Sequence, residues 1–192
     1  MLLSRLSSRL LIATALLLML VGTRGHHFAS LHHLPSASWA VFFIGGLYLA
    51  RRGWFALLMA SAVTLDLLAV TIGGVDNFCV SPAYPALLAA YGSLWLAGRQ
   101  AAQALSISGF SGRALLVCSG WLLAGFACCE LLSSGSFYLF SGHFSQPSLS
   151  EFGQRLLAYG PANLQSLALY SAGALALHGA LQGLSVGRRL KA

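Results

Sequence analysis

The sequence contains very little charge. Aspartate and glutamate together number four, lysine and arginine number 11, and charged residues make up 8% of the 192 residues. Soluble globular domains carry roughly 25% charged residues, and a soluble chain with so few would expose apolar surface and aggregate. Because 57% of the residues are hydrophobic, the composition excludes a soluble domain and favours an integral membrane protein.

Several catalytic motifs are also absent from the sequence. It contains no G-x-S-x-G, no H-E-x-x-H and no phosphate-binding glycine loop, so nothing in it resembles a hydrolase or a nucleotide-binding enzyme. We therefore expect no nucleotide site and no transport powered by ATP through this chain alone. The formal charge of +7 would suggest nucleic acid in a soluble protein. In a membrane protein it reflects basic residues beside the spans, and we expect no nucleic-acid partner.

Six apolar segments are candidates for membrane spans, each of which needs about 20 mostly apolar residues. The expected spans are 9–23, 37–50, 54–73, 83–98, 113–132 and 159–184. They fill most of the chain, so we predict an all-α membrane protein with one transmembrane domain over residues 1–192. The first span lacks a good cleavage site after it and is expected to be an uncleaved helix rather than a signal peptide. The turn 51–53 predicts a tight hairpin, and Pro161 is expected in the first turn of the last helix.

The basic residues fix the predicted orientation. With the N-terminus in the cytoplasm, nine lie inside and two outside; the inside set is Arg5, Arg9, Arg51, Arg52, Arg99, Arg113, Arg188, Arg189 and Lys191, and the outside set is Arg24 and Arg155. Cytoplasmic loops of membrane proteins carry an excess of arginine and lysine. Both termini are therefore predicted to be cytoplasmic, which also requires an even number of spans.

This orientation places the remaining polar residues at the outer face. The external loops are 24–36, 74–82 and 133–158, and they contain most of the histidines and half of the acids. Asp66 and Glu130 lie in the outer parts of their spans. Aromatic residues also gather at the outer ends, as an interfacial aromatic belt would. The third external loop is long, and loops of that length are usually functional or disordered, so a lid over a site is plausible.

Cys79 is the most informative candidate for chemistry. It precedes Ser81 and Pro82, which suit the cap and the first position of a helix. The partial positive charge of a helix N-terminus lowers the pKa of a nearby thiol, and thiolate is a soft metal ligand and a nucleophile. The alternatives are an ordinary apolar cysteine or a disulfide with Cys128 or Cys129. Cys118, in mid-span, is expected to serve packing.

Asp66 lies within an apolar run, where an unpaired carboxylate costs several kcal/mol, so it is a functional candidate by default. It could accept hydrogen bonds from a ligand's amides, or pair with a histidine or a neighbouring helix. The adjacent pairs His26-His27 and His32-His33 consist of imidazoles, which suit nickel, cobalt and zinc, although this spacing does not place two ligands on one helix face. A pocket-lining role for His27 is the stronger interpretation. His178, deep in the last span, is expected to be a hydrogen-bonded core residue.

The order of these features resembles the BtuM family, small bacterial cobalamin-uptake proteins related to the substrate-binding S-components of energy-coupling-factor (ECF) transporters. The matching residues cover roughly 24–100 and are Asp66, Gly74-Val75, Phe78-Cys79-Val80-Ser81-Pro82-Ala83-Tyr84, Tyr91-Gly92 and Trp95-Leu96-Ala97-Gly98. The resemblance implies a six-helix, S-component-like bundle in the bacterial inner membrane, in contact with lipid, that binds cobalamin (vitamin B12) at its periplasmic face.

The resemblance also implies roles for individual residues. Cys79 occupies the position of a cysteine that ligates the corrin cobalt. Asp66, Tyr84 and His27 would contact the corrin amides or the cobalt region, and Arg155 is a weaker candidate. A thiolate on cobalt must displace an axial ligand such as cyanide, water or an alkyl group, which makes Cys79 the candidate catalytic residue for decyanation or dealkylation.

One departure concerns the energising partner. S-components that share an ECF module often carry an A-x-x-x-A pattern on the first helix, where a partner helix packs closely. Here Ala13 is followed four residues later by Leu17, and Ala15 by Met19. The chain is therefore expected either to use such a module differently or to act alone.

Two other functions remain open from the residues. The first is uptake of free cobalt or nickel ions through the histidines of the first external loop, for which His27 is a weak metal ligand candidate. The second is a membrane enzyme that uses Cys79 with Asp66 and a histidine. The first predicts metal binding that does not depend on Cys79, and the second predicts turnover rather than stoichiometric capture.

Overall fold

The computed structural model describes residues 6–24, 35–72 and 81–189, and all regular secondary structure in these ranges is helical. The six helices are α1 (Leu6–Arg24), α2 (Ser38–Tyr48), α3 (Arg52–Thr71), α4 (Ala86–Ser108), α5 (Gly112–Phe140) and α6 (Leu149–Arg189). The predicted all-α class is confirmed. Each helix overlaps one predicted span, and the short connection 49–51 confirms the hairpin between the second and third.

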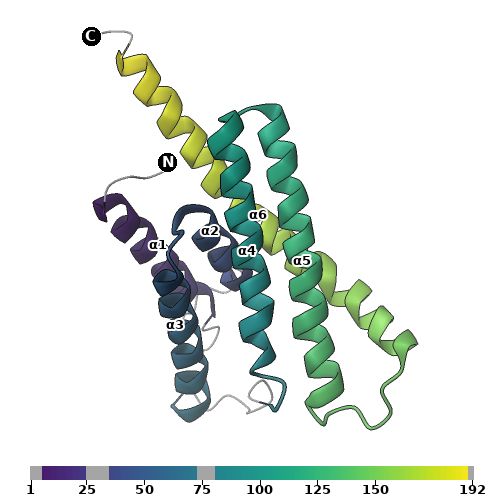
Figure 1. The fold of residues 1–192 in the computed structure, drawn as a ribbon. Helices are drawn as coiled ribbons and strands as arrows, with labels where there is room; N and C mark the ends of the chain where they lie inside the picture. Colours follow the sequence, from purple (N-terminus) through teal and green to yellow (C-terminus); the bar gives the residue numbers. More distant parts are fainter. Residues whose placement is uncertain (1–5, 25–34, 73–80, 190–192) are drawn as a thin grey trace.

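The helices pack around α2, which lies at the centre of the molecule (Figure 1). The most extensive pairings are α4 with α5 and α2 with α4, and α6 runs obliquely behind them. On the other side of α2 lie α1 and α3. The first turns of α1 and the last turns of α6 lie toward the same end of the molecule, the upper end in Figure 1.

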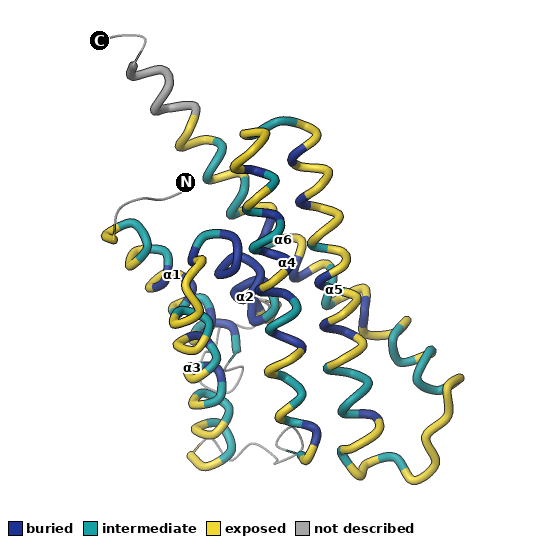
Figure 2. The backbone as a smooth tube through the Cα atoms, in the orientation of Figure 1, coloured by how far each residue is buried: buried dark blue, intermediate teal, exposed yellow. Residues whose placement is uncertain are grey.

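Helix α2 is short and buried on nearly all sides. Its 11 residues rise about 16 Å, roughly half the thickness of a bilayer core, and nine of them are buried. Figure 2 shows this burial along the helix. A helix that is apolar all round belongs in the interior of a bundle, and the composition of α2 therefore explains its central position.

Two glycines allow α2 and α4 to approach to backbone contact. A Cβ atom added to Gly46 would overlap the carbonyl oxygen of Trp95, and one added to Gly98 would overlap the carbonyl oxygen of Phe43. Small residues at helix interfaces permit such close approach in membranes. This contact fixes the position of α4, whose first turns carry side chains of the site described below.

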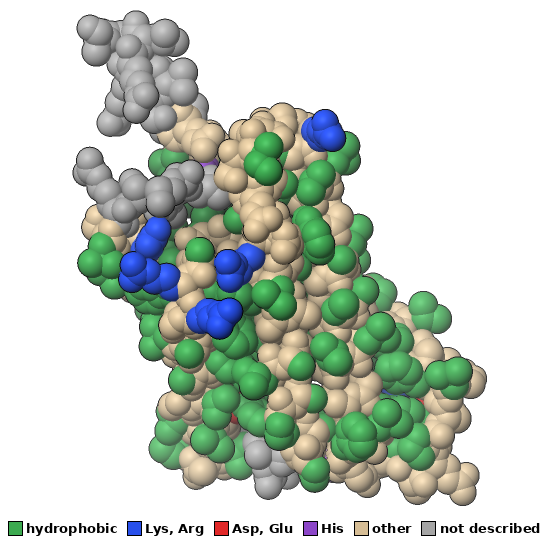
Figure 3. All heavy atoms as spheres, viewed as in Figure 1, with side chains coloured by type: hydrophobic (Ala, Val, Ile, Leu, Met, Phe, Trp, Pro, Cys, Tyr) green, Lys and Arg blue, Asp and Glu red, His purple; other side chains and the backbone are tan. Residues whose placement is uncertain are grey.

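Three helices, α1, α3 and α5, are long and apolar enough to cross a membrane by length and composition. Their outward faces expose large apolar side chains, with Leu11 74%, Leu18 68% and Leu116 75% exposed. Such exposure is expected of a surface in contact with lipid. In Figure 3 the visible basic side chains lie over the upper and middle parts of the molecule, and none is visible at its lower end.

The predicted external loop 133–158 is wrong, because most of it is helical. Helix α5 continues to Phe140 and α6 begins at Leu149, which leaves only residues 141–148 as the connection. The serines of 133–136 remain in the helix because their hydroxyls bond back to it; Ser136 donates to the carbonyl of Ser133 at 3.0 Å. A lid of 25 residues is therefore absent. Pro161 lies inside α6 rather than in its first turn, where it removes one backbone hydrogen bond from the helix.

The start of α4 also differs from the prediction. The helix begins at Ala86 with Pro85 at its N-cap position, and Ser81 does not cap it. Ser81 instead opens a turn, in which its carbonyl accepts a hydrogen bond from the amide of Tyr84 at 2.9 Å and its hydroxyl accepts one from Ala83 at 3.3 Å. Pro85 has no amide hydrogen, so the regular helical ladder starts after it.

Candidate functional site

A cavity of about 620 Å³ lies at the end of the bundle where α2 and α4 begin and α1 and α5 end. All six helices contribute to its wall or to the turn that leads into it. Its lining residues are Arg24, Pro35, Ser36, Ser38, Trp39, Asp66, Ser81, Ala83, Tyr84, Leu87, Tyr91, Ser133, Ser134, Ser136, Phe137, Ala162, Asn163 and Ser166. The volume lies within the range of about 300–1,000 Å³ that is typical of ligand pockets.

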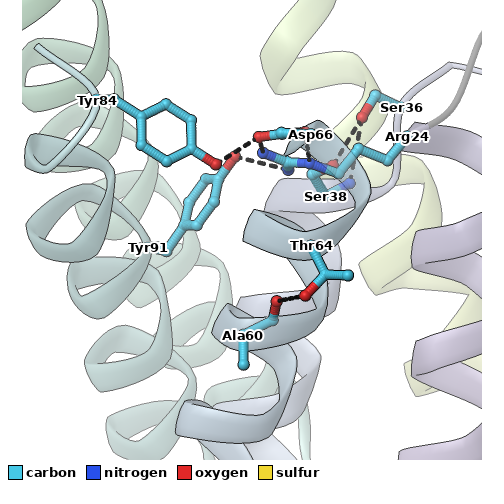
Figure 4. A network of polar contacts seen from close by, with 8 residues as sticks. All are labelled: Arg24, Ser36, Ser38, Ala60, Thr64, Asp66, Tyr84 and Tyr91. Carbon is cyan, nitrogen blue, oxygen red and sulfur yellow. Dashed lines mark hydrogen bonds and ion pairs between the residues drawn. The ribbon is translucent and has the colours of Figure 1, made fainter. Parts of the chain in front are cut away.

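Asp66 pairs with Arg24 on one side of this cavity (Figure 4). The guanidinium donates from Nε to Oδ1 and from Nη2 to Oδ2, both at 2.7 Å. The two side chains are only 12% and 20% exposed, and a two-point contact of this kind is strong and directional. The sequence left open whether Asp66 pairs with a ligand, a histidine or a neighbouring helix. In the structure its partner belongs to a neighbouring helix, because Arg24 is the last residue of α1.

Two tyrosines complete this group, which we call the Arg24–Asp66 cluster (Arg24, Asp66, Tyr84 and Tyr91). The hydroxyl of Tyr84 donates to Oδ2 of Asp66 at 2.7 Å, and Nη1 of Arg24 donates to the hydroxyl of Tyr91 at 2.9 Å. Tyr91 is buried and stacks on Phe42 with 4.4 Å between ring centroids. The cluster thus joins α1, α3, α4 and the turn before α4, and its formal charges cancel.

Neighbouring hydroxyls do not all take part in the cluster. Thr64, on the same helix as Asp66, donates to the carbonyl of Ala60 at 2.8 Å and is satisfied within α3. Ser36 and Ser38 bond to each other at 3.0 Å on the adjacent wall. Figure 4 shows both pairs beside the cluster. On this side of the cavity, Asp66 thus accepts hydrogen bonds from Arg24 and Tyr84, and these neighbouring hydroxyls do not contribute to the cluster.

The short segment before α2 is held to the cavity wall from two sides. The hydroxyl of Thr23 accepts a hydrogen bond from the amide of Ala37 at 3.0 Å, which ties the end of α1 to the start of α2. From α6, Tyr170 donates to the carbonyl of Pro35 at 2.8 Å and Ser166 donates to the carbonyl of Ser36. These bonds satisfy backbone groups that would otherwise be left unpaired.

A second carboxylate lies behind the opposite wall. Glu130 on α5 is buried, with 5% of its surface exposed. Its Oε1 accepts a hydrogen bond from the hydroxyl of Ser134 at 2.8 Å, and its Oε2 accepts one from Nδ2 of Asn163 on α6 at 3.0 Å. Both donors line the cavity, so Glu130 orients two of its polar wall residues.

Arg155 lies apart from the Arg24–Asp66 cluster. It pairs with Glu151 at 3.2 Å and its guanidinium lies 4.3 Å from the ring centroid of Phe144. It lines a smaller neighbouring cavity of about 270 Å³, which shares only Ser134 and Phe137 with the larger one. Hydrogen bonds from Tyr138 and Arg155 hold the pKa of Glu151 below its ordinary value. The structure therefore does not bring Arg155 together with Asp66 and Tyr84.

Cys79 and His27, like His26, His32 and His33, lie outside the described residues. The two cysteines proposed as disulfide partners, Cys128 and Cys129, are free thiols. Within the described ranges, no three histidine, cysteine, aspartate or glutamate residues gather as a metal site would require. Cys118 is buried and contacts the carbonyl of Ala101 at 3.5 Å, as expected of a packing residue. His178 forms the expected hydrogen bond, to Tyr48 at 3.0 Å, but it is half-buried and does not belong to the core.

Sequence reasoning overlooked three residues of the site. Arg24 was counted only as one of two external basic residues, Tyr91 only as part of a motif, and Asn163 not at all. A signal existed for Arg24, because an ionisable residue within a span usually pairs with another and Arg24 is the basic residue nearest the outer end of α1. Asn163 had no comparable signal, since it lies in a region of α6 with no charged neighbour in sequence.

Comparison of the chain with models of known protein families gave no match, and comparison with curated proteins gave none either.

Proposed function

We propose that the protein binds cobalamin in the cavity beside the Arg24–Asp66 cluster and mediates its uptake across the bacterial inner membrane. It acts as a transporter of the BtuM type, with the cavity open to the periplasm. In this proposal Asp66, Tyr84 and His27 contact the corrin, and Cys79 ligates the cobalt. Arg155 is not assigned to this cavity, because it lines the neighbouring one.

One observation carries this proposal. Asp66 and Tyr84, which the resemblance selects as corrin contacts, are 18 residues apart in sequence, yet they share a hydrogen bond of 2.7 Å on the wall of one cavity. Ser81, two residues after Cys79 in the sequence, lines the same cavity, as does Arg24, three residues before His27. Each of the residues expected to act together therefore either lines this cavity or lies within three positions, in sequence, of a residue that lines it.

The proposed role of Cys79 is ligand exchange at cobalt. The thiol loses its proton, a cobalt–sulfur bond forms and the bond from cobalt to cyanide breaks. Cyanide leaves with its electron pair and takes up a proton, so that the oxidation state of cobalt does not change. Thiolate is a soft ligand that competes well at transition metals.

The proposed topology has six crossings with both termini in the cytoplasm. The bias of nine basic residues against two supports it, as does the placement of the first turns of α1 and the last turns of α6 at one end of the molecule. Helix α2 is too short to cross alone, and in this topology it crosses together with its flanking residues 35–37 and 49–51. The missing small-residue pattern on α1 favours a protein that acts without a standard ECF module.

The test is the absorption spectrum of cobalamin bound to the purified protein. We expect the wild type to shift the corrin bands on binding, and Cys79→Ser to abolish or weaken that shift because serine is a poor cobalt ligand. Cys128→Ser is the matched control, since Cys128 is an exposed free thiol. Identical spectra for the wild type and Cys79→Ser would overturn the cobalt-ligand role, and no cobalamin binding by the wild type would overturn the function.

A further inference from the structure

A groove of about 720 Å³ lies between α1 and α6 and shares no lining residue with the cavity described above. Its walls are formed by residues in the stretch 8–19 of α1 and in the stretch 169–182 of α6. Both helices pack against α2, whose Ile44 and Tyr48 line the groove between them. Leu11, Leu177 and Leu181 also line it and are exposed. This α1–α6 groove is therefore open on a side where a membrane protein meets lipid.

The polar side chains of the α1–α6 groove gather at one end. Ser8, Tyr48, His178 and Gln182 line this end, which lies toward the first turns of α1 and the last turns of α6. The rest of the wall is mainly aliphatic. From residue 8 to residue 19, α1 rises about 16 Å, close to the depth of one leaflet of a hydrocarbon core about 30 Å thick. The groove thus has the length and the polarity of one leaflet.

Tyr48 carries a hydrogen that has no acceptor among the described residues. Nε2 of Gln182 lies 2.8 Å from Nε2 of His178. Because an amide nitrogen only donates, the imidazole accepts at Nε2 and holds its proton on Nδ1. Nδ1 then donates to the hydroxyl oxygen of Tyr48 at 3.0 Å, and the hydroxyl hydrogen is left over. Since an unpaired donor in an apolar wall is costly, an occupant of the groove gains by presenting an acceptor there.

The charged residues nearest this end in sequence are basic. Arg9 follows Ser8, and Arg51 and Arg52 lie three and four residues after Tyr48. All three belong to the set predicted to lie in the cytoplasm. None of the acidic residues that the structure describes lines the groove. A basic pocket between membrane helices on the cytoplasmic side suits the headgroup of an anionic lipid.

The size of the groove favours a lipid over a helix from another protein. A helix is 10–12 Å wide with its side chains, so 16 Å of it occupies about 1,200 Å³ or more. The groove holds about 720 Å³ and would not admit it fully. A hydrocarbon chain is much narrower and can reach the floor formed by Ile44 and Tyr48. The volume also lies within the range of about 300–1,000 Å³ that is typical of small-molecule sites.

We propose that the α1–α6 groove binds one phospholipid with an anionic headgroup. An acyl chain lies between α1 and α6, and a phosphate or ester oxygen accepts the hydrogen of Tyr48. In the proposed orientation this lipid belongs to the cytoplasmic leaflet. It joins α1 to α6 and stabilises the folded protein, as a ligand of the native state does. The site is separate from the proposed vitamin cavity, and neither proposal depends on the other.

The experiment measures lipid binding to the purified, delipidated full-length chain in detergent by native mass spectrometry. We expect dioleoylphosphatidylglycerol to bind about fivefold or more tightly than dioleoylphosphatidylcholine, because each nearby arginine favours an anionic headgroup. Tyr48→Phe should weaken phosphatidylglycerol binding about fivefold to tenfold, since it removes one hydrogen bond to a charged acceptor. Tyr159→Phe changes an exposed tyrosine of α6 outside the groove and should keep the wild-type affinity.

A second variant fills the groove without changing its polar end. Gly173 lines the groove, and a Cβ atom there meets nothing within 4 Å, so a leucine has room and takes the place of the acyl chain. We expect Gly173→Leu to lower the affinity for phosphatidylglycerol about tenfold or more. Gly120→Leu is the matched control, because Gly120 is exposed on α5, has the same open surroundings and does not line the groove. Leucine is the better helix former, so both variants should fold.

Three results would overturn the lipid site. The first is an unchanged affinity for phosphatidylglycerol in folded Tyr48→Phe or Gly173→Leu. The second is equal affinity of the wild type for the two phospholipids, which would reduce the groove to an ordinary lipid contact. The third is a dimer that Gly173→Leu abolishes, which would place a second copy of the chain in the groove.

Discussion

Asp66 is the residue on which the candidate site is built. It accepts hydrogen bonds from Arg24 at both oxygens and from Tyr84 at one. Removing one partner from a buried ion pair leaves an uncompensated charge, which is far more damaging than neutralising both partners. The ion pair therefore predicts a large loss of stability when one partner is replaced and a small loss when both are replaced.

We expect Arg24→Gln to destabilise the folded protein by about 2–3 kcal/mol, somewhat less than for a fully buried pair, because it leaves Asp66 charged in an apolar setting. The double variant Arg24→Gln with Asp66→Asn should recover most of the loss. The measurement is thermal unfolding in detergent, with wild type and both variants compared under one condition. Equal losses in the single and double variants would show that the ion pair has no structural role.

At this scale the sequence predicted some residues of the site and not others. Asp66 was expected because a carboxylate in an apolar run stands out in the sequence, and Tyr84 was expected only from the resemblance. The structure joins the two by a hydrogen bond. Arg24 and Asn163 were missed as site residues, since their partners Asp66 and Glu130 lie 42 and 33 positions away. A pairing across such distances depends on how helices pack, which a single sequence does not state.

Among the elements, α2 and α4 approach each other to backbone contact at two glycines. Gly46 and Gly98 face the backbone of the opposite helix, and neither has room for a Cβ atom. Since the backbone cannot move away as a flexible side chain can, a larger residue must separate the two helices. Such a shift would also move the first turns of α4, which carry Tyr91.

We expect Gly98→Ala to destabilise the protein by about 1–3 kcal/mol or more through overpacking and to weaken ligand binding. Gly92→Ala is the matched control on the same helix, because a Cβ atom there meets nothing within 4 Å. Alanine is also the better helix former, so the control should be neutral or slightly stabilising. Unfolding in detergent checks both, and equal stability of the two variants would refute the proposed close contact.

The existence of each helix was predictable, but several boundaries were not. Apolar runs identified all six, whereas α4, α5 and α6 extend well beyond their predicted spans. The serine-rich stretch after Glu130 looked like a loop because serine favours turns. In the structure, Ser134 and Ser136 direct their hydroxyls to groups of their own helix, and that option is not visible in composition.

Most of the basic residues lie away from the cavity, whereas Arg24 lines it and Arg155 lines the smaller cavity beside it. The basic side chains visible in Figure 3 lie over the upper and middle parts of the molecule, and the cavity lies where α1 and α5 end. In the proposed topology these two regions face the cytoplasm and the periplasm, respectively. Orientation in a membrane depends on the charge of short loops more than on packing.

We expect a fluorescent protein fused after Ala192 to fluoresce in a bacterial host and alkaline phosphatase at the same point to be inactive, because the C-terminus is cytoplasmic in the proposed topology. Alkaline phosphatase inserted after Gly142, in the connection between α5 and α6, should be active in the periplasm. The reverse pattern would invert the orientation and place the cavity at the cytoplasmic face.

The Arg24–Asp66 cluster also has a mechanical consequence. Arg24 is the residue directly before the segment 25–34, and Tyr84 follows the segment 73–80 by four residues. One carboxylate therefore holds the last residue of α1 and the turn before α4 together. A ligand that donates a hydrogen bond to Asp66 competes with Arg24 and Tyr84 at once, so its arrival and departure act on the end of α1 and on the turn before α4 as a single event.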